Sequence, residues 1–487
     1  MKILREVDNT TLELSFESLD ERKRLEKLVS YKVPGHEFSP SYLTGHWDGT
    51  KCFLSPKNCI KKGIFKSLFP DHQSVYDTNF VDLSFNDIPL YKNNKAYERR
   101  EYQLKAINSI LRHKHGIICS TVGSGKTLIS AATISYLLSK NNKTKVLFVV
   151  YDKNILSQSI TNFTRYGFNV SQYGNNIKDL SGEIVVATIQ SLSRIENPKK
   201  ILKDFTACWA DESHHTKSKT SKTVLTKLVN CKYFIGLTAT PPKERTLELA
   251  TLMSVLGPII FNYDMKQSVA NGNIAPVKCI FYKLPFNSEV KGSVITKRNY
   301  KYIWETAICN SPQRNNAITE LVKNVVMLLN APGLIYVDRV LHGNEIANKL
   351  LCNSQIKLCQ MYGSDNIMVR DMKKEQLMND DINVLVSSVV TEGIDMRISP
   401  VIAVNAAGRK NFISQIQFLG RIVRANQKFG SFRILYDFID TAHPLLKKHS
   451  EERIQNCRDT GSDVIICSSL NEVLLETVKY YKQCNKD

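Results

Sequence analysis

The sequence has no run of about 18 consecutive apolar residues, the length that a membrane-spanning helix needs. Its N-terminus, MKILREVDNTTLELSFESLDERKR, is interrupted by charge before the apolar core of a secretory signal peptide could form. These two absences predict a protein that folds and works in the cytoplasm.

Closely spaced cysteine pairs are also missing. The 12 cysteines are scattered along the chain, and no two of them form the Cys-x-x-Cys spacing that would suggest a zinc knuckle or a redox site. Internal repeats and low-complexity tracts are absent as well. We expect reduced cysteines that serve as packing residues.

Acidic residues are few compared with basic ones. Lys and Arg number 66 against 46 Asp and Glu, which gives a formal net charge of +20. Such a surplus favours a polyanionic partner, since each neutralised phosphate releases condensed counterions, and nucleic acid is the commonest partner of this kind. Charge alone does not separate DNA from RNA, or either from a membrane surface.

The chain's 487 residues are too many for one ordinary core, and the pattern changes along them. From about residue 116, short apolar runs alternate with amphipathic stretches, the pattern of a parallel sheet covered by helices. The predicted strands are residues 116–120, 145–150, 183–188, 207–211 and 233–239, and then 333–337, 356–362, 382–388, 400–406 and 432–438. The fold class is therefore α/β, with two such domains in tandem.

Five parts are expected. They are a small N-terminal α+β module that binds DNA (1–95), a first α/β domain (96–262), a linker or insertion with an irregular pattern (263–312), a second α/β domain (313–442) and a C-terminal extension (443–487). The extension reads as a charged helix, a short strand and a final helix.

The stretch STVGSGKT, residues 120–127, directly follows the first predicted strand. Gly123 and Gly125 allow a tight turn that points N–H groups at phosphate oxygens, and the next helix adds its positive N-terminus. Lys126 would reach the β- and γ-phosphates, and Thr127 would hold Mg²⁺. The generic pattern has Gly where this chain has Ser120, so an ordinary turn before a helix is the alternative. The residues expected at the nucleotide are Ser120, Thr121, Val122, Gly123, Ser124, Gly125, Lys126 and Thr127.

The stretch DESHH, residues 211–215, ends another predicted strand. At the edge of a sheet that carries a phosphate loop, Asp211 would hold Mg²⁺ and Glu212 would orient the attacking water. A zinc site would need more ligands, and the His-Glu-x-x-His spacing is absent. One of the two histidines, His214 or His215, would be an ordinary hydrogen-bonding residue, and the other could link the nucleotide site to the neighbouring domain.

The stretch QIQFLGRIVR places Gln417, Gly420, Arg421 and Arg424 on one face if it is helical. Two arginines there could stabilise charge on a transferring phosphoryl group, provided that the face points at a phosphate loop on the other domain. The alternative is a solvated basic helix face. The mostly apolar neighbours favour an ATP site at an interdomain cleft.

Together these stretches resemble the motifs of superfamily 2 helicases of the DExH type. DESH is similar to the DExH box, STVGSGKT to the family's phosphate loop, and QxxGRxxR to motif VI, whose arginines act as fingers. LTATP (237–241) is similar to motif III and makes Thr238 and Thr240 coupling residues together with His214. The resemblance implies two tandem RecA-like domains that hydrolyse ATP with Mg²⁺, with Lys126, Asp211, Glu212, Gln417, Arg421 and Arg424 as catalytic residues.

Further stretches resemble the remaining motifs. RREYQLKAI (99–107) is similar to the adenine-reading segment, which implies nucleotide contacts from Arg100, Tyr102 and Gln103. TEGIDM (391–396) is similar to motif V, which implies that Thr391 touches the nucleic-acid backbone and that Gly393 and Asp395 approach the ribose. YDKNILSQS (151–159) and ATIQSL (187–192) are similar to motifs Ia and Ic, which implies nucleic-acid contacts from Gln158, Thr188 and Gln190.

The N-terminal stretch FSPSYLTGHWDG (38–49) resembles a segment of the phage UvsW helicases, which remodel branched DNA. The resemblance implies branch migration or fork regression in recombination, repair or replication, with replication or recombination proteins as partners and the host-cell cytoplasm as location. The expected DNA contacts of this module are Trp47, Lys51, Lys61 and Lys62, although Trp47 could equally serve the module's own packing. The alternatives are an RNA helicase or ribonucleoprotein remodeller, and a clamp that binds nucleic acid without hydrolysis.

Overall fold

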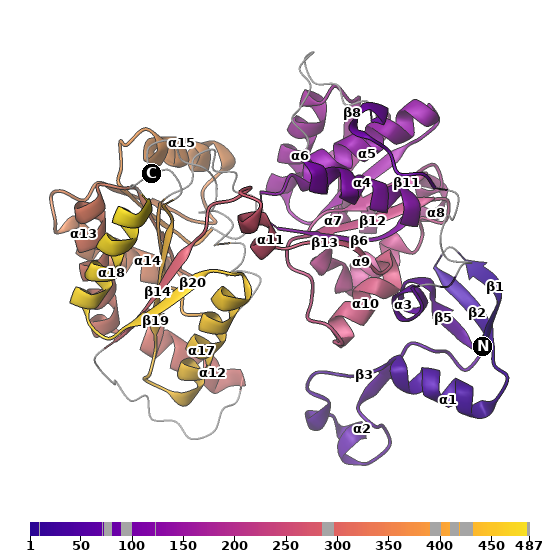
Figure 1. Cartoon of the computed structure of the whole chain (residues 1–487), viewed down its shortest axis with the longest axis horizontal. Coiled ribbons are helices and arrows are strands. Elements are labelled where there is room, and N and C mark those ends of the chain that lie inside the picture. The colour runs from indigo at the N-terminus through magenta and orange to yellow at the C-terminus, as the bar shows by residue number, and fades with distance from the viewer. Residues whose placement is uncertain are drawn as a thin grey trace. The chain divides into compact units, whose positions relative to one another are not determined.

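Figure 1 shows a computed structural model of the chain. It describes residues 1–8, 10–70, 72, 80–88, 100–121, 123–284, 297–389, 401–409, 418 and 432–484. The chain divides into two compact units, Met1–Tyr263 and Asp264–Asp487. Within the described ranges, no helix is long and apolar enough to cross a membrane.

The first unit is built on a sheet whose described strands run in the order β13-β6-β12-β11-β7-β10-β8-β9. Neighbouring strands are parallel except for β8 and β9. The central strands are runs of Val, Ile and Leu without alternation because helices cover both of their faces. The strands are β6 (His115–Ser120), β7 (Val146–Val150), β8 (Val170–Gly174), β9 (Ile177–Lys178), β10 (Ile184–Thr188), β11 (Ala207–Ala210), β12 (Tyr233–Thr238) and β13 (Ile259–Tyr263).

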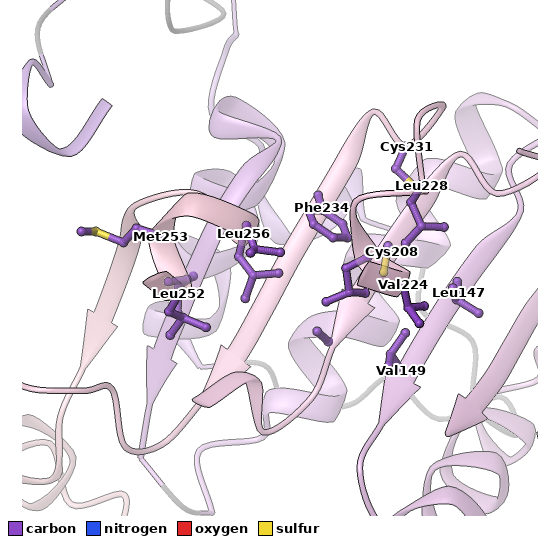
Figure 2. Packing of buried hydrophobic residues seen from close by; sticks show 14 of the residues in the cluster. Leu147, Val149, Cys208, Val224, Leu228, Cys231, Phe234, Leu252, Met253 and Leu256 are labelled. Carbon is purple, nitrogen blue, oxygen red and sulfur yellow. The ribbon is translucent and has the colours of Figure 1, made fainter. Parts of the chain in front are cut away.

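Two hydrophobic cores lie on opposite faces of this sheet. One core joins Phe148 of β7 and Trp209 of β11 to helices α4, α5 and α6. The other joins the alternate residues, among them Leu147 and Cys208, to α7, α9 and α10 (Figure 2). The helical elements of this domain are α4 (Glu101–His113), α5 (Lys126–Lys140), α6 (Lys153–Arg165), α7 (Ile189–Ser193), α8 (Pro198–Leu202), the 3-10 turn η4 (Ser213–Lys217), α9 (Lys219–Leu225) and α10 (Leu247–Leu256).

The N-terminal module belongs to the same unit. It has an antiparallel sheet β1-β2-β5 and a two-stranded sheet β3-β4, and its core is continuous with the α9 and α10 side of the large sheet. Helix α3 approaches α10 so closely that a Cβ atom on Gly63 would overlap the Met253 carbonyl. Its elements are β1 (Lys2–Asp8), β2 (Thr11–Ser15), α1 (Leu19–Leu28), β3 (Ser30–Lys32), η1 (His36–Phe38), α2 (Pro40–Leu43), β4 (Thr50–Cys52), β5 (Cys59–Lys61) and α3 (Lys62–Leu68), followed by η3 (Phe85–Asp87).

The second unit is built on a sheet whose described strands are all parallel, in the order β16-β17-β15-β18-β19-β14-β20. Cores again lie on both faces, with α13, α14 and α18 on one and α11, α15 and α17 on the other. The strands are β14 (Lys278–Lys283), β15 (Gly333–Tyr336), β16 (Leu358–Met361), β17 (Val384–Ser387), β18 (Ile402–Asn405), β19 (Ile434–Ile439) and β20 (Asp463–Cys467). The helices are α11 (Met265–Ala270), α12 (Lys297–Trp304), the π-helical η5 (Glu305–Cys309), α13 (Pro312–Leu329), α14 (Val340–Leu351), α15 (Ile367–Met378), α17 (Pro444–Asp459) and α18 (Leu470–Cys484).

The predicted α/β class with two parallel sheets is confirmed, and so is each predicted strand, as β6, β7, β10, β11 and β12 in the first unit and β15 to β19 in the second. The final helix, strand and helix are present as α17, β20 and α18. Residues 263–312 hold more regular structure than their irregular pattern suggested. Their strand β14 pairs with both β19 and β20, so this segment and the C-terminal one complete the second sheet. Sequence reasoning also missed β8, β9 and β13.

Candidate ATP site and nucleic-acid edge

The phosphate loop joins β6 to α5. Gly123 and Gly125 have φ angles of 79° and 81°, in the left-handed region that glycine adopts without steric cost. A Cβ atom on Gly125 would lie 2.7 Å from Nε2 of Gln103, so a larger residue there would require the Gln103 side chain to shift. The loop ends at Lys126, where the first turn of α5 offers free N–H groups to an anion.

The segment that is expected to read adenine holds this loop in place. The Tyr102 hydroxyl and Nε2 of Gln103 donate hydrogen bonds to the Ser124 carbonyl, at 2.7 and 3.0 Å. Oε1 of Gln103 accepts a bond from the Arg100 N–H at 3.0 Å. Both ends of the Gln103 amide are thus bonded to the protein, and an adenine contact would require these bonds to be exchanged.

Lys126 bends back over the loop. Its Nζ donates to the carbonyls of Ser120 and Thr121, at 3.1 and 3.4 Å. Two weakly held carbonyl contacts on a cation are readily replaced by phosphate oxygens, which are stronger acceptors. Thr127, on the same helical turn, is half-buried.

Asp211 and Glu212 lie at the carboxyl edge of the sheet, two strands away from the phosphate loop. The Asp211 N–H bonds the Val149 carbonyl at 2.9 Å, and Oδ1 of Asp211 accepts the Glu212 N–H at 2.9 Å. Burial raises the pKa of Asp211, while the charge of Lys126 and the Glu212 N–H oppose that rise.

Glu212 has a φ of 42°, in the left-handed region that costs a non-glycine residue free energy. The next residues form η4, so the strained residue is the bend between β11 and this turn. Strain of this kind persists where the surrounding structure holds it, often at functional sites.

Strand β12 lies between β6 and β11, which places Thr238 between the phosphate loop and the acidic pair. Nδ1 of His214 is 3.4 Å from the Thr238 hydroxyl and 3.4 Å from Oε2 of Glu212. The Thr238 hydroxyl also accepts the Thr240 N–H at 3.1 Å. Among the described residues, the buried hydroxyls of Thr121, Ser213 and Thr240 have no hydrogen-bond partner, which leaves polar capacity for a ligand.

The expected nucleic-acid contacts of the first domain have different settings. Gln190 is exposed, and its Nε2 donates to the Tyr151 carbonyl at 3.3 Å. Gln158 is half-buried on α6. The Thr188 side chain is buried and caps α7 by accepting the Ser191 N–H at 3.3 Å, so this hydroxyl already serves the fold.

The expected contacts of the N-terminal module also differ in their surroundings. Trp47 donates from Nε1 to the Thr50 carbonyl at 2.7 Å, the packing role that was the alternative for it. Lys61 bonds two threonine hydroxyls, and Lys62 forms an ion pair with Glu6 at 2.5 Å. Lys51 is exposed. Lys51 is therefore the cation of this set that is placed best for a phosphate.

Several expected residues lie outside the described part of the chain. They are Val122, Thr391, Gly393, Asp395, Gln417, Arg421 and Arg424. Sequence reasoning in turn missed two aromatic residues at strand ends. Tyr263 stacks on Tyr102 with centroids 4.0 Å apart, and its carbonyl accepts the Thr121 N–H at 3.0 Å. Tyr151, which follows β7, contacts η4. A tyrosine directly after an apolar strand was the available signal for Tyr151, whereas Tyr263 is the last residue of β13, a strand that the sequence analysis also missed.

Comparison with known proteins bears on this arrangement. Residues 96–243 match the family "Type III restriction enzyme, res subunit". "Putative helicase 22" of Sulfolobus islandicus filamentous virus is 25% identical over 84% of this chain and 75% of its own length. "ATP-dependent DNA helicase uvsW" of Enterobacteria phage T4 is 23% identical over 86% of each chain. These similarities make the chain an ATP-dependent helicase that resembles the two viral enzymes.

This helicase also resembles "Putative ATP-dependent RNA helicase L396" of Acanthamoeba polyphaga mimivirus, which is 24% identical over 90% of this chain and 81% of its own length. A solved fragment of a putative HsdR subunit of a type I restriction enzyme from Vibrio vulnificus has a TM-score of 0.58 at 18% identity, covering 86% of this chain and 77% of that one. At that identity the structural likeness concerns the fold alone, two RecA-like domains in tandem.

Proposed function

We propose that this helicase remodels branched DNA, by branch migration or fork regression in recombination, repair or replication. The observation that carries the proposal is the similarity to the phage DNA helicase, which extends over 86% of both chains and so beyond the motor alone. The N-terminal module supports it, because its core is continuous with that of the first α/β domain. A module fixed to the motor could hold a duplex while the motor moves along it.

The geometry of the described residues supports the roles that we propose for Lys126 and Glu212 at the ATP site. Lys126 exchanges its two carbonyl contacts for phosphate oxygens, and the phosphate loop surrounds them with N–H groups. Glu212 orients the attacking water, and its contact with His214 reports the nucleotide state to Thr238. The arginines 421 and 424 are proposed to stabilise charge on the transferred phosphoryl group.

Thr127 and Asp211 would hold Mg²⁺. A hydroxyl and a carboxylate fit this ion, which prefers oxygen ligands and usually keeps several waters and substrate phosphates. When bound, the ion would neutralise charge that develops on the phosphate oxygens. Burial favours the protonated form of Asp211, so a cation nearby would favour its ionised form.

A panel of nucleic acids tests the proposal. Four-way and forked DNA should stimulate ATP hydrolysis and be converted to products, whereas single-stranded RNA should stimulate little. Lys126→Ala should abolish hydrolysis while DNA binding persists, and Lys140→Ala, an exposed lysine at the other end of α5, should behave as the wild type. Equal hydrolysis by the Lys126 variant would refute the ATP site.

The second candidate is an RNA helicase or ribonucleoprotein remodeller. It is favoured by the similarity to the protein named a putative RNA helicase, over 90% of this chain. Stronger stimulation by RNA than by any DNA in the same panel would select this candidate. Binding without hydrolysis in every arm would instead leave a nucleic-acid clamp.

A further inference from the structure

His215 is the member of the DESHH stretch that the proposed ATP chemistry does not use. Its ring lies 4.2 Å from that of His214, centroid to centroid, and 5.2 Å from that of Tyr151. The interplanar angle is 41° for both pairs. His215 therefore contacts the ATP-site histidine on one side and a residue of the motif Ia stretch on the other.

Tyr151 is held to the same turn by a second contact. Its hydroxyl shares a hydrogen bond of 2.7 Å with Oγ1 of Thr216, a residue with 0% exposure. Burial raises the pKa of Tyr151, so the phenol stays protonated and can donate. The Tyr151 side chain is thus contacted by two consecutive residues of η4, His215 and Thr216.

The backbone of Tyr151 contacts Gln190, one of the residues expected to bind nucleic acid; we call the sheet edge that carries Tyr151 and Gln190 the nucleic-acid edge. Its carbonyl accepts a bond from the exposed Gln190 at 3.3 Å. The sheet order explains this position, because β7 lies between β11, which ends at the acidic pair, and β10, which leads into α7. Tyr151 follows β7 directly and reaches both neighbours.

These contacts form one unbroken series from Glu212 through His214, His215 and Tyr151 to Gln190. We propose that His215 and Tyr151 are positioning residues that transmit the nucleotide-dependent placement of η4 to the nucleic-acid edge. The element that would move is η4, which begins at the strained Glu212. When Glu212 and His214 shift with the bound nucleotide, η4 moves Tyr151 and with it the carbonyl that orients Gln190. The inference rests on the proposed function, since it takes Glu212 as the water-orienting residue.

The test measures coupling separately from chemistry. His215→Ala and Tyr151→Phe, which removes only the hydroxyl, are compared with the wild type for ATP hydrolysis with and without saturating forked DNA. Basal hydrolysis should stay within about twofold, while the DNA-stimulated rate falls about 3- to 20-fold, the range of single-residue coupling effects. The change in DNA affinity on adding a non-hydrolysable ATP analogue should shrink by a similar factor.

Tyr173→Phe is the matched control, because Tyr173 is a buried tyrosine of the same sheet on β8 and lies outside the series. It should retain full stimulation. The DNA-stimulated rate of the double variant His215→Ala, Tyr151→Phe should be no lower than that of the more impaired single variant, since both substitutions remove the same link.

Three results would overturn the inference. They are full stimulation in both single variants, equal loss of basal and stimulated rates, and additive losses in the double variant. Failure of the proposed function looks different, since the wild type itself would then show no response of ATP hydrolysis to any nucleic acid.

Discussion

The two units differ in how their inward-lying charged side chains are bonded. In the second unit, Arg453 is 0% exposed and bonds Asp437, Asp440 and the carbonyls of Gly408 and Phe438. Asp437 also accepts from Asn405 at 2.8 Å. In the first unit, the half-buried Asp211 carboxylate accepts one hydrogen bond from the described residues, that of the adjacent Glu212 N–H at 2.9 Å.

This difference in bonding indicates which charged groups stabilise the fold and which are available for function. A buried ion network in which almost every group has partners ties together the elements that carry it, here α17, β19 and the segment after β18. A half-buried carboxylate with little bonding keeps its capacity for a ligand, and its site carries strain at Glu212 instead of compensation. We therefore expect substitutions at Asp211 and Glu212 in the first unit to lower activity. Substitutions in the Arg453 network of the second unit should lower stability.

Glu212→Gln should give the largest effect. It keeps the size of the side chain and removes the charge that we propose orients water, so ATP hydrolysis should fall by about 10²- to 10⁴-fold. ATP binding and the free energy of unfolding should stay near the wild-type values. Steady-state hydrolysis, nucleotide binding and urea unfolding measure the three quantities.

The control is Glu244→Gln, an exposed glutamate in the loop that follows β12. It should change none of the three quantities. If Glu212→Gln unfolded the protein instead of slowing ATP hydrolysis, the contrast between the charged groups of the two units would be wrong.

Arg453→Met should have the reverse profile. It leaves Asp437 and Asp440 buried without their shared guanidinium, a loss of about 3–5 kcal/mol for a broken buried pair. Hydrogen exchange of peptides from β19 and α17 should become faster, while peptides from β6 and β11 keep their protection. Mass spectrometry of exchanged peptides from the full chain separates the two units.

The exposed pair of Lys479 and Glu476 on α18 provides the comparison. Lys479→Met should cost less than about 1 kcal/mol, since exposed ion pairs contribute little. Equal effects of Arg453→Met and Lys479→Met on hydrogen exchange would contradict the structural role that we assign to the Arg453 network.

How far the sequence predicts this protein depends on how local each signal is. Strands such as β7 and the glycines of the phosphate loop could be predicted, because apolar runs and positive φ angles are set by neighbouring residues. The partners of Gln103 and the strand β14 could not. Their environment comes from segments distant in sequence, such as Ser124 for Gln103 and β19 and β20 for β14.

The same reasoning explains the lysines of the N-terminal module. Lys51, Lys61 and Lys62 look alike in the sequence, but Lys61 and Lys62 are engaged by threonines and by Glu6. Composition gives the net charge of a surface, whereas tertiary contacts decide which cations remain available to a phosphate.

Lys66 is a third kind of buried charge and should give the smallest effect. Its side chain is 5% exposed and lies where α3 packs against α10. Burial is the main cause that lowers the pKa of Lys66 to about 8, and the charge of Lys62 is the second. Between that value and the ordinary pKa of 10.5 the unfolded chain binds more protons than the folded one. The free energy of unfolding should therefore rise as the pH increases through this window.

Lys66→Met should remove this pH dependence and raise the stability near pH 7 by on the order of 2 kcal/mol. Urea unfolding of the wild type and the variant at pH 7, 8, 9 and 10 measures the difference, with the exposed Lys51→Met as control. The two curves should converge as the pH rises, because deprotonation of Lys66 relieves the same burial cost that the substitution removes. Parallel curves would mean that burial does not lower the pKa of Lys66, and they would contradict this prediction.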